Sequence, residues 1–159
     1  MKRINSVLFV CMGNICRSPT AEAIFKAKAA RRGVAIEVDS AGTIDYHQGE
    51  QSDRRARAAG ERRGYDFSSI RARGVSDYDF AHFDLILAAD NHNMRDLMQR
   101  CPVEHRHKLA LMLSFAKSDH TEVPDPYYGG DKGFELVLDL LEQSCDRLLD
   151  NIQYGSGEL

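Results

Sequence analysis

The segment from Val7 to Ala21, VLFVCMGNICRSPTA, constrains the fold of this chain more than any other. It opens with Val7–Val10, an unbroken apolar run that is typical of a strand buried on both faces of a parallel sheet. Cys11 then lies at the carboxyl end of this strand, the edge where open α/β sheets bind ligands. Beyond the loop, Ser18 is a good N-cap and is followed by proline, which predicts a helix that begins just after Arg17.

The loop between this strand and helix has the composition of an anion cradle. Gly13 and Asn14 adopt left-handed backbone angles most easily, so the loop N–H groups can turn inward, ahead of the positive end of the helix. Arg17 adds a planar fork that binds two phosphoryl oxygens, and the Ser18 hydroxyl could donate to the sulfur of Cys11. The pattern predicts a phosphate site with a cysteine nucleophile at its base. Its candidate binding residues are Met12, Gly13, Asn14, Ile15, Cys16 and Ser18.

Apolar runs and helical periodicities alternate along the rest of the chain. This order predicts one α/β domain over residues 1–154, with a four-stranded parallel sheet and helices on both faces, a flavodoxin-like three-layer sandwich. The polar residues 155–159 are expected to form a loose tail. The expected strands are 7–10, 34–38, 85–88 and 108–113, and the expected helices are 19–32, 53–63, 91–100 and 131–152, the last with an apolar stripe from Phe134 to Ile152.

Composition narrows the classes of function. The net charge of −3 over 159 residues supports neither nucleic-acid nor membrane binding. The apolar run near Lys2 and Arg3 is too short for an export signal, and no run approaches the ~18 residues of a membrane span, which predicts a cytoplasmic protein. The four cysteines are then expected to be reduced thiols. The histidines lack ligand spacing, so neither a metal site nor a cofactor is expected.

Cleavage of a phosphate ester also needs an acid, because the leaving oxygen departs more easily when it is protonated. Asp125 is the candidate, since Pro124 and Pro126 restrict the backbone on both sides of it. By itself it would be a turn aspartate. Its neighbours Tyr127 and Tyr128, together with the cysteine loop, favour the catalytic role.

These segments resemble those of the low-molecular-weight protein tyrosine phosphatases. The family's C-x5-R-[ST] signature is matched by Cys11 through Arg17 and Ser18, and two distant segments, DSAGT at 39–43 and PDPYYG at 124–129, match as well. The resemblance covers nearly the whole chain. It implies metal-independent hydrolysis of phosphotyrosine through a phosphocysteine on Cys11, with Arg17 holding the phosphoryl group and Asp125 as general acid and then base. The implied partner is a phosphotyrosine protein, a tyrosine kinase being one candidate.

Further roles follow from the resemblance. Tyr46, Tyr127 and Tyr128 could form aromatic walls for a phosphotyrosine ring, although simple exposed packing explains Tyr46 equally well. Ile15 stands where related arginine phosphatases carry threonine, which favours aryl phosphates over phosphoarginine. The family's serine of the S-A-G-T segment supports the loop asparagine, here Ser40 and Asn14.

Two departures or additions concern the support of the loop. Many family members have a histidine in that network where Ile70 aligns, which predicts a smaller support shell here. Family relatives share both loop cysteines, so Cys16 is expected to trap oxidised Cys11 as a disulfide and protect it; packing beneath the cradle is the alternative.

Other features and functions were open alternatives. A basic helix could meet acidic substrate segments, but a solvated face is the simpler interpretation. Asp90 could orient Arg17 or cap the helix that follows it.

Arsenate reductases share the fold and the cysteine loop, yet the segment from Asp90 to Arg100 lacks the relay cysteines they need. A binding module without activity would not need Cys11, Arg17 and Asp125 together. A monomer with weak self-association is expected. The basic helix considered above carries Arg54, Arg55, Arg57, Arg62 and Arg63.

Overall fold

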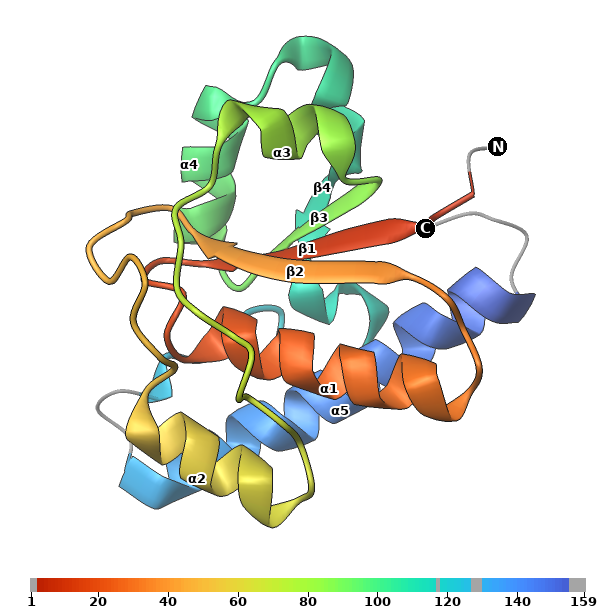
Figure 1. Cartoon of the computed structure of the whole chain (residues 1–159). Helices are drawn as coiled ribbons and strands as arrows, with labels where there is room; N and C mark the ends of the chain where they lie inside the picture. Colours follow the sequence, from red (N-terminus) through yellow and green to blue (C-terminus); the bar gives the residue numbers. More distant parts are fainter. Residues whose placement is uncertain (1–2, 117, 127–129, 155–159) are drawn as a thin grey trace.

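A computed structural model describes residues 3–116, 118–126 and 130–154 of the chain. Its centre is one sheet of four parallel strands in the order β2-β1-β3-β4. Figure 1 shows α1, α2 and α5 over one face of this sheet and α3 and α4 over the other. The predicted four-stranded α/β sandwich is therefore confirmed. The strands are β1 (Ser6–Cys11), β2 (Glu37–Gly42), β3 (Leu85–Ala88) and β4 (Leu109–Leu111), and the helices are α1 (Arg17–Arg31), α2 (Arg54–Arg62), α3 (Asp77–His82), α4 (Asn91–Arg100) and α5 (Gly130–Tyr154).

Strand β1 is the centre of the core, and all six of its residues are buried. Because successive side chains of a strand point to opposite faces, β1 serves two apolar clusters. Val7 and Phe9 join the cluster that contains the buried side chains of α1 and α5. Leu8 and Val10 join the cluster with Phe80 of α3 and other residues on the opposite face. The prediction of a strand buried on both faces is confirmed.

The chain order around β1 also places the functional site. After β1 the chain forms α1 and β2 on one side of it, and only later adds β3 on the other side. The strand order therefore reverses at β1, and such a reversal opens a crevice beyond the carboxyl ends of the strands. The loops that follow Cys11 and Ala88 meet at this crevice.

The second strand was expected at 34–38, and this prediction is wrong. Pairing with β1 begins at Glu37, which lies opposite Ser6, and continues to Gly42, which lies opposite Cys11. Val34 instead completes the end of α1, because its N–H donates to the carbonyl of Ala29. Val34 and Ile36 are apolar because they pack on the core from the connecting loop, so burial rather than strand pairing explains the pattern.

Two further differences concern short elements. The sequence reading missed α3, a single helical segment that begins with a capping box in which Ser76 and Asp79 bind each other's backbone. The strand expected at 108–113 contains only Leu109–Leu111, flanked by the 3-10 helices η1 (Val103–Lys108) and η2 (Met112–Phe115). The predicted ranges of α1, α2, α4 and α5 agree with the structure within two residues at each end.

The long helix α5 packs on α1, α2 and η2. Its apolar stripe, from Phe134 to Leu149, is buried as predicted, and Ile152 packs partly buried at its end. Arg63, at the end of α2, binds Glu135 and Glu142 of α5 and fixes the two helices to each other. Among the described residues, none of the helices contains an apolar stretch that could span a bilayer. The predicted tail, 155–159, lies outside the described residues.

Candidate active site

Cys11 is the last residue of β1, and its sulfur lies at the start of α1. The Oγ of Ser18 is 3.0 Å from Cys11 Sγ, and the backbone N–H of Ser18 donates to the same sulfur over 3.5 Å. The first turn of a helix carries unpaired N–H groups and the positive end of the helix dipole. The sulfur therefore lies where negative charge is favoured.

Ser18 does not cap α1, contrary to the sequence prediction. The helix begins at Arg17, with Cys16 at the N-cap position and no side-chain capping bond. The Ser18 hydroxyl is instead turned toward the loop, where it contacts Cys11 and Asn14. Buried hydroxyl groups are normally hydrogen-bonded, and that of Ser18 is bonded to Cys11 Sγ and Asn14 Nδ2.

The buried side chain of Asn14 binds the loop to Ser18, Ser40 and Arg73, and these bonds determine which way the Ser18 hydroxyl donates. Its Oδ1 accepts from the N–H of Arg73 over 3.0 Å, so its Nδ2 must face Ser18 and Ser40, at 2.8 and 2.9 Å. Nδ2 can only donate, so the Ser18 oxygen is the acceptor and its own hydrogen is left for Cys11. Asn14 also takes a φ of 57°, as expected for this residue type in a tight loop.

The predicted contact between Ser40 and Asn14 is present, and the support extends further than predicted. The hydroxyl of Ser40 donates over 2.6 Å to Oε1 of Glu22, a carboxylate in a residue that is only 3% exposed. The other carboxylate oxygen of Glu22 binds Lys26. Ile70 is buried in the apolar core. Glu22 therefore adds a hydrogen-bonding group to the support of the loop. The sequence signal for it is a glutamate among the apolar residues in the first half of α1.

Gly42, the last residue of β2, lets the strand end pass close to the loop that follows Cys11. An added Cβ at this position would lie 2.6 Å from the carbonyl oxygen of Met12 and 2.7 Å from that of Ile44. The close approach lets the backbone of Thr43 and Ile44 donate to the carbonyls of Cys11 and Met12. Thus the end of β2 binds the first residues of the loop directly.

Arg17 is held by two groups from distant parts of the chain. Its Nη1 donates to Oδ2 of Asp90 over 2.8 Å and to the carbonyl of Val123 over 2.9 Å. Both Nη1 hydrogens are thereby used, so an anion in front of the loop would be bound through Nε and Nη2. Burial of Arg17 opposes its charge, but the nearby Cys11 and the hydrogen bond to Asp90 outweigh it, so the pKa of Arg17 is raised.

Asp90 performs both of the roles considered for it. Its Oδ1 accepts from the N–H of Asn93 and caps α4, while its Oδ2 binds Arg17. Partial burial raises the pKa of this carboxyl, and the bonds from Asn93 and Arg17 lower it more strongly, so the pKa lies below its ordinary value. Asp90 is therefore the charged partner that fixes the guanidinium.

The loop forms the floor of a cavity of about 570 Å³. Asp125 faces this cavity together with Cys11 and Arg17, so the structure brings the three predicted catalytic residues together. Asn14, Ser18 and Ser40 are buried behind the loop and do not line it. Tyr127 and Tyr128 lie outside the described residues. The lining consists of Cys11, Met12, Gly13, Ile15, Cys16, Arg17, Ile44, Tyr46, His47, Asp53 and Asp125.

Three lining residues were missed by the sequence reading. Ile44 lies just beyond Gly42, His47 supports the loop rim by binding Glu50, and Asp53 caps α2. Tyr46 is 82% exposed and its ring meets the edge of the His47 ring, with centroids 4.9 Å apart. Nothing in the local sequence distinguishes these residues, because only the curvature of the 43–53 segment brings them to the cavity.

Cys16 lines the same cavity as Cys11. Burial, and then the charges of Asp53 and Cys11, raise the pKa of Cys16 to about 12. Cys16 is therefore a neutral thiol at physiological pH. The other two cysteines, Cys101 and Cys145, are buried away from the cavity.

Comparison with known proteins agrees with this geometry. The family model described as low molecular weight phosphotyrosine protein phosphatase matches residues 6–156. A low molecular weight protein-tyrosine-phosphatase of Bacillus subtilis, YfkJ, is 41% identical over 151 residues, covering 93% of this chain and 96% of that protein. The human low molecular weight phosphotyrosine protein phosphatase is 38% identical over 149 residues, covering 91% and 94%.

Solved structures match equally well. A crystal structure of a protein tyrosine phosphatase from Entamoeba histolytica, with Hepes in its active site, superposes with a TM-score of 0.91 at 46% identity, covering 95% of this chain and 98% of that one. The crystal structure of YfkJ superposes with a TM-score of 0.90 at 39% identity and covers 98% of each chain. This chain, with its cysteine and arginine on one loop below a shared cavity, belongs to the low molecular weight phosphotyrosine protein phosphatase family.

Proposed function

We propose that this protein hydrolyses phosphotyrosine in polypeptides through a phosphocysteine intermediate on Cys11. One observation carries the proposal: Cys11, Arg17 and Asp125 line the same cavity, with the Cys11 sulfur 3.0 Å from the Ser18 hydroxyl. These three side chains supply the nucleophile, the phosphoryl clamp and the proton that cleavage of an aryl phosphate requires. Their proximity supports all three roles.

In the first step the ionised sulfur of Cys11 attacks phosphorus, and an S–P bond forms as the P–O bond to the phenol breaks. Asp125 gives its proton to the leaving phenolic oxygen and becomes a carboxylate. The loop N–H groups and Arg17 hold the three equatorial oxygens, where negative charge gathers. Asp90 keeps the guanidinium in place during this step.

In the second step water attacks phosphorus and the S–P bond breaks, which releases phosphate. Asp125, now ionised, takes a proton from the water and returns to its acid form. The departing sulfur carries negative charge, and the Ser18 hydroxyl is placed to donate to it. No metal ion takes part in either step of this proposal.

The cavity walls support an aryl ester as the substrate. Ile15, Ile44 and Tyr46 provide apolar and aromatic surface beside the loop, against which a phenyl ring would bury area. Isoleucine at position 15 supports phosphotyrosine over phosphoarginine. Tyr127 and Tyr128, which follow Asp125 in the chain, are proposed to complete the aromatic wall.

The proposed partner is a phosphotyrosine-bearing protein, with a tyrosine kinase among the candidates. The four cysteines of the chain are all free thiols. Free thiols are typical of proteins that act in the reducing cytoplasm, which supports a cytoplasmic location as part of this proposal. A monomer with weak self-association remains the proposed oligomeric state.

The direct test is hydrolysis of p-nitrophenyl phosphate with a chelator present. The native protein should be active, Cys11→Ser should be inactive, and Asp125→Ala should be slowed about a hundredfold, the usual contribution of a positioned acid or base. A native protein without activity would contradict the proposal, and arsenate reduction would be the next assay. Faster turnover of phosphoarginine than of phosphotyrosine would contradict the aryl preference.

A further inference from the structure

The general acid proposed for this site lies in a loop, so its direction depends on what holds that loop. Asp125 stands between Pro124 and Pro126, in the connection from η2 to α5. We call residues 122–126 the acid loop. Side chains on loops are aimed less precisely than those on helices and strands unless neighbouring contacts fix the backbone. The contacts of the acid loop therefore bear on the proposed reaction.

Val123 provides the first anchor of the acid loop. Its side chain is 1% exposed and joins the apolar cluster that contains the buried side chains of α1 and α5. Its N–H donates over 2.8 Å to the carbonyl of Ala89, and its own carbonyl accepts from Nη1 of Arg17 over 2.9 Å. Val123 is thus fixed in position, two residues before Asp125. The chain on either side of it still has two rotatable backbone angles per residue.

Glu122 provides the second anchor, and it does so through its side chain. Its Oε2 accepts from the N–H of Asn91 over 2.8 Å. Asn91 is the first residue of α4, where the N–H has no acceptor within the helix and the positive end of the helix dipole favours a carboxylate. Two anchors on successive residues stop the acid loop from pivoting about Val123.

Three consecutive residues that lead from β3 into α4 bind three parts of the site. The residue pairs are Ala89 with Val123, Asp90 with Arg17, and Asn91 with Glu122. The phosphate clamp and the acid loop are therefore fixed to the same short connection, which follows directly on an inner strand of the sheet. This common attachment sets the position of Asp125 relative to the phosphoryl group that Arg17 would hold.

We propose that Glu122 is a positioning residue of the phosphatase reaction: its bond to Asn91 holds the acid loop so that Asp125 stays directed at the leaving oxygen. The inference rests on the proposed function and adds a residue that does not line the catalytic cavity. It concerns the first step, in which the S–P bond forms, the P–O bond breaks and the proton of Asp125 passes to the phenolic oxygen. Loss of the bond to Asn91 impairs this proton transfer and leaves the binding of phosphate in place.

The experiment uses two leaving groups that need the acid to different degrees. Phenyl phosphate releases a phenol with a pKa of about 10, as for a tyrosine side chain. The nitro group of p-nitrophenyl phosphate stabilises the departing phenolate, which therefore needs less protonation. The quantity measured for both substrates is kcat/KM, which includes the first step. Glu122→Ala removes the acceptor, whereas Glu122→Gln keeps an oxygen that can accept from Asn91.

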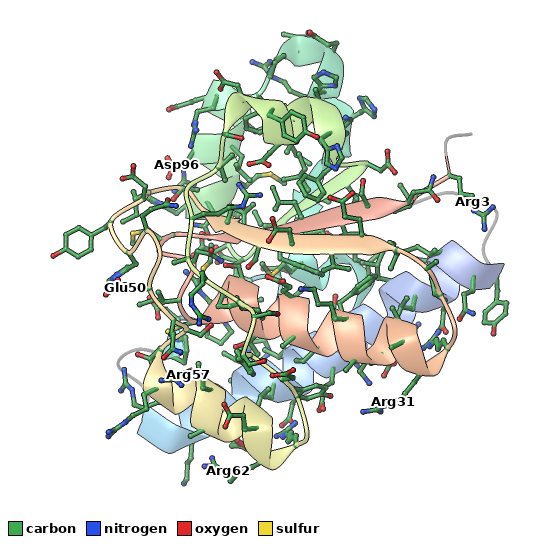
Figure 2. The ribbon with its side chains drawn as sticks, in the orientation of Figure 1. Arg3, Arg31, Glu50, Arg57, Arg62 and Asp96 are labelled. Atoms are coloured by element: carbon green, nitrogen blue, oxygen red, sulfur yellow. The ribbon has the colours of Figure 1, made fainter. Side chains whose placement is uncertain are left out.

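A matched control removes a carboxylate from α4 itself, away from the start of the helix. Figure 2 shows Asp96 on α4, and its side chain is 39% exposed and lies 3.5 Å from Nδ1 of His92. Asp96→Ala changes the net charge by the same amount as Glu122→Ala but leaves the N–H of Asn91 bound. The control should keep the native kcat/KM for both substrates.

We expect kcat/KM of Glu122→Ala to fall about tenfold for phenyl phosphate and less than about threefold for p-nitrophenyl phosphate, because loss of one hydrogen bond to a carboxylate corresponds to about tenfold in rate. Glu122→Gln should keep at least about half of the native value for both substrates. In an Asp125→Ala background, Glu122→Ala should lower kcat/KM by no more than about twofold further, because the residue that it positions is gone.

Unchanged kcat/KM for phenyl phosphate in Glu122→Ala would overturn the inference, and so would equal falls for both substrates, which would place the role of Glu122 outside the proton transfer. A further tenfold loss in the Asp125→Ala background would overturn it as well, since Glu122 would then act independently of the acid. Inactivity of the native protein toward both substrates would instead contradict the phosphatase function itself, and with it the inference.

Discussion

Asp90 fixes the guanidinium of Arg17 and caps α4 at the same time, with its two oxygens divided between the tasks. Oδ2 lies 2.8 Å from Arg17 Nη1, and Oδ1 lies 2.8 Å from the N–H of Asn93. The arginine that would clamp phosphate is thereby bound to the end of β3, the neighbour of β1 in the sheet. One carboxylate thus joins the phosphate loop to the second loop at the crevice.

Asp90→Asn should therefore weaken one of the two bonds whichever way the amide turns, since asparagine has only one acceptor oxygen. We expect kcat/KM for p-nitrophenyl phosphate to fall about tenfold, because a hydrogen bond to a charged group contributes about 1.5–3 kcal/mol. Steady-state kinetics and thermal unfolding measure the two effects. Asp96→Asn, on the same helix, is the control, and equal activity in both variants would contradict the role of Asp90.

Glu22→Ala should destabilise the loop support. The Ser40 hydroxyl would lose its acceptor in a buried place, which costs about 1–3 kcal/mol of unfolding free energy. Lys26→Ala removes only the partly exposed partner of the same carboxylate, and should cost about 0–1 kcal/mol. Denaturant unfolding of both variants measures the difference. Equal losses would mean that the contact between Glu22 and Ser40 contributes little.

Gly42→Ala should disturb the phosphate loop. The new Cβ would lie 2.6 Å from a backbone oxygen of Met12, and relief of such a clash costs about 1–3 kcal/mol. Since the loop carries Cys11, we expect kcat/KM to fall at least about tenfold, as small misplacements of reacting groups slow catalysis strongly. Gly133→Ala, whose Cβ would meet nothing nearer than 3.5 Å, should keep its activity. Normal kinetics in Gly42→Ala would argue against a tight approach.

Ser18→Ala should slow the second step more than the first. Without the hydroxyl 3.0 Å from Cys11 Sγ, the sulfur is a poorer leaving group, and we expect kcat to fall about tenfold. Rapid mixing with p-nitrophenyl phosphate should then show a burst of p-nitrophenol equal to the enzyme concentration. Ser144→Ala, which also removes a buried hydroxyl but at a residue that does not line the cavity, controls for packing. A slow phase without a burst would place the effect in the first step.

Cys16 should form a disulfide with Cys11 after mild peroxide treatment, detectable by mass spectrometry. The pKa of Cys16 is raised to about 12. The disulfide closes when the Cys16 thiolate attacks the oxidised sulfur of Cys11, because only the thiolate form attacks. Disulfide closure should therefore accelerate as the pH rises toward that value, by about tenfold per unit while the thiolate fraction is small. In Cys16→Ser, Cys11 should instead oxidise irreversibly. Irreversible oxidation of Cys11 as the main product in the native protein would contradict the protective role.

An element could be predicted when the residues that determine it are close together in the sequence. The strand at Val7–Val10 and the ends of α4 follow from local apolar runs and capping residues, so they were predicted correctly. The second strand was misplaced because Val34 and Ile36 pack on the core as a loop. Local pattern detects burial in both cases, but it does not distinguish a paired strand from a packed connection.

The candidate site divides in the same way. The chemistry proposed for Cys11, Arg17 and Asp125 could be inferred from residue types and local spacing, and the signature segments indicated the family. Glu22 behind Ser40, Asp53 and His47 at the rim, and Phe134 beneath Arg55 come from separate elements. Their contacts depend on how β2, α2 and α5 settle against the sheet. The sequence therefore determined the sheet class and the reactive groups, whereas only tertiary packing decided which side chains support, surround and flank them, because such contacts join residues that no local pattern relates.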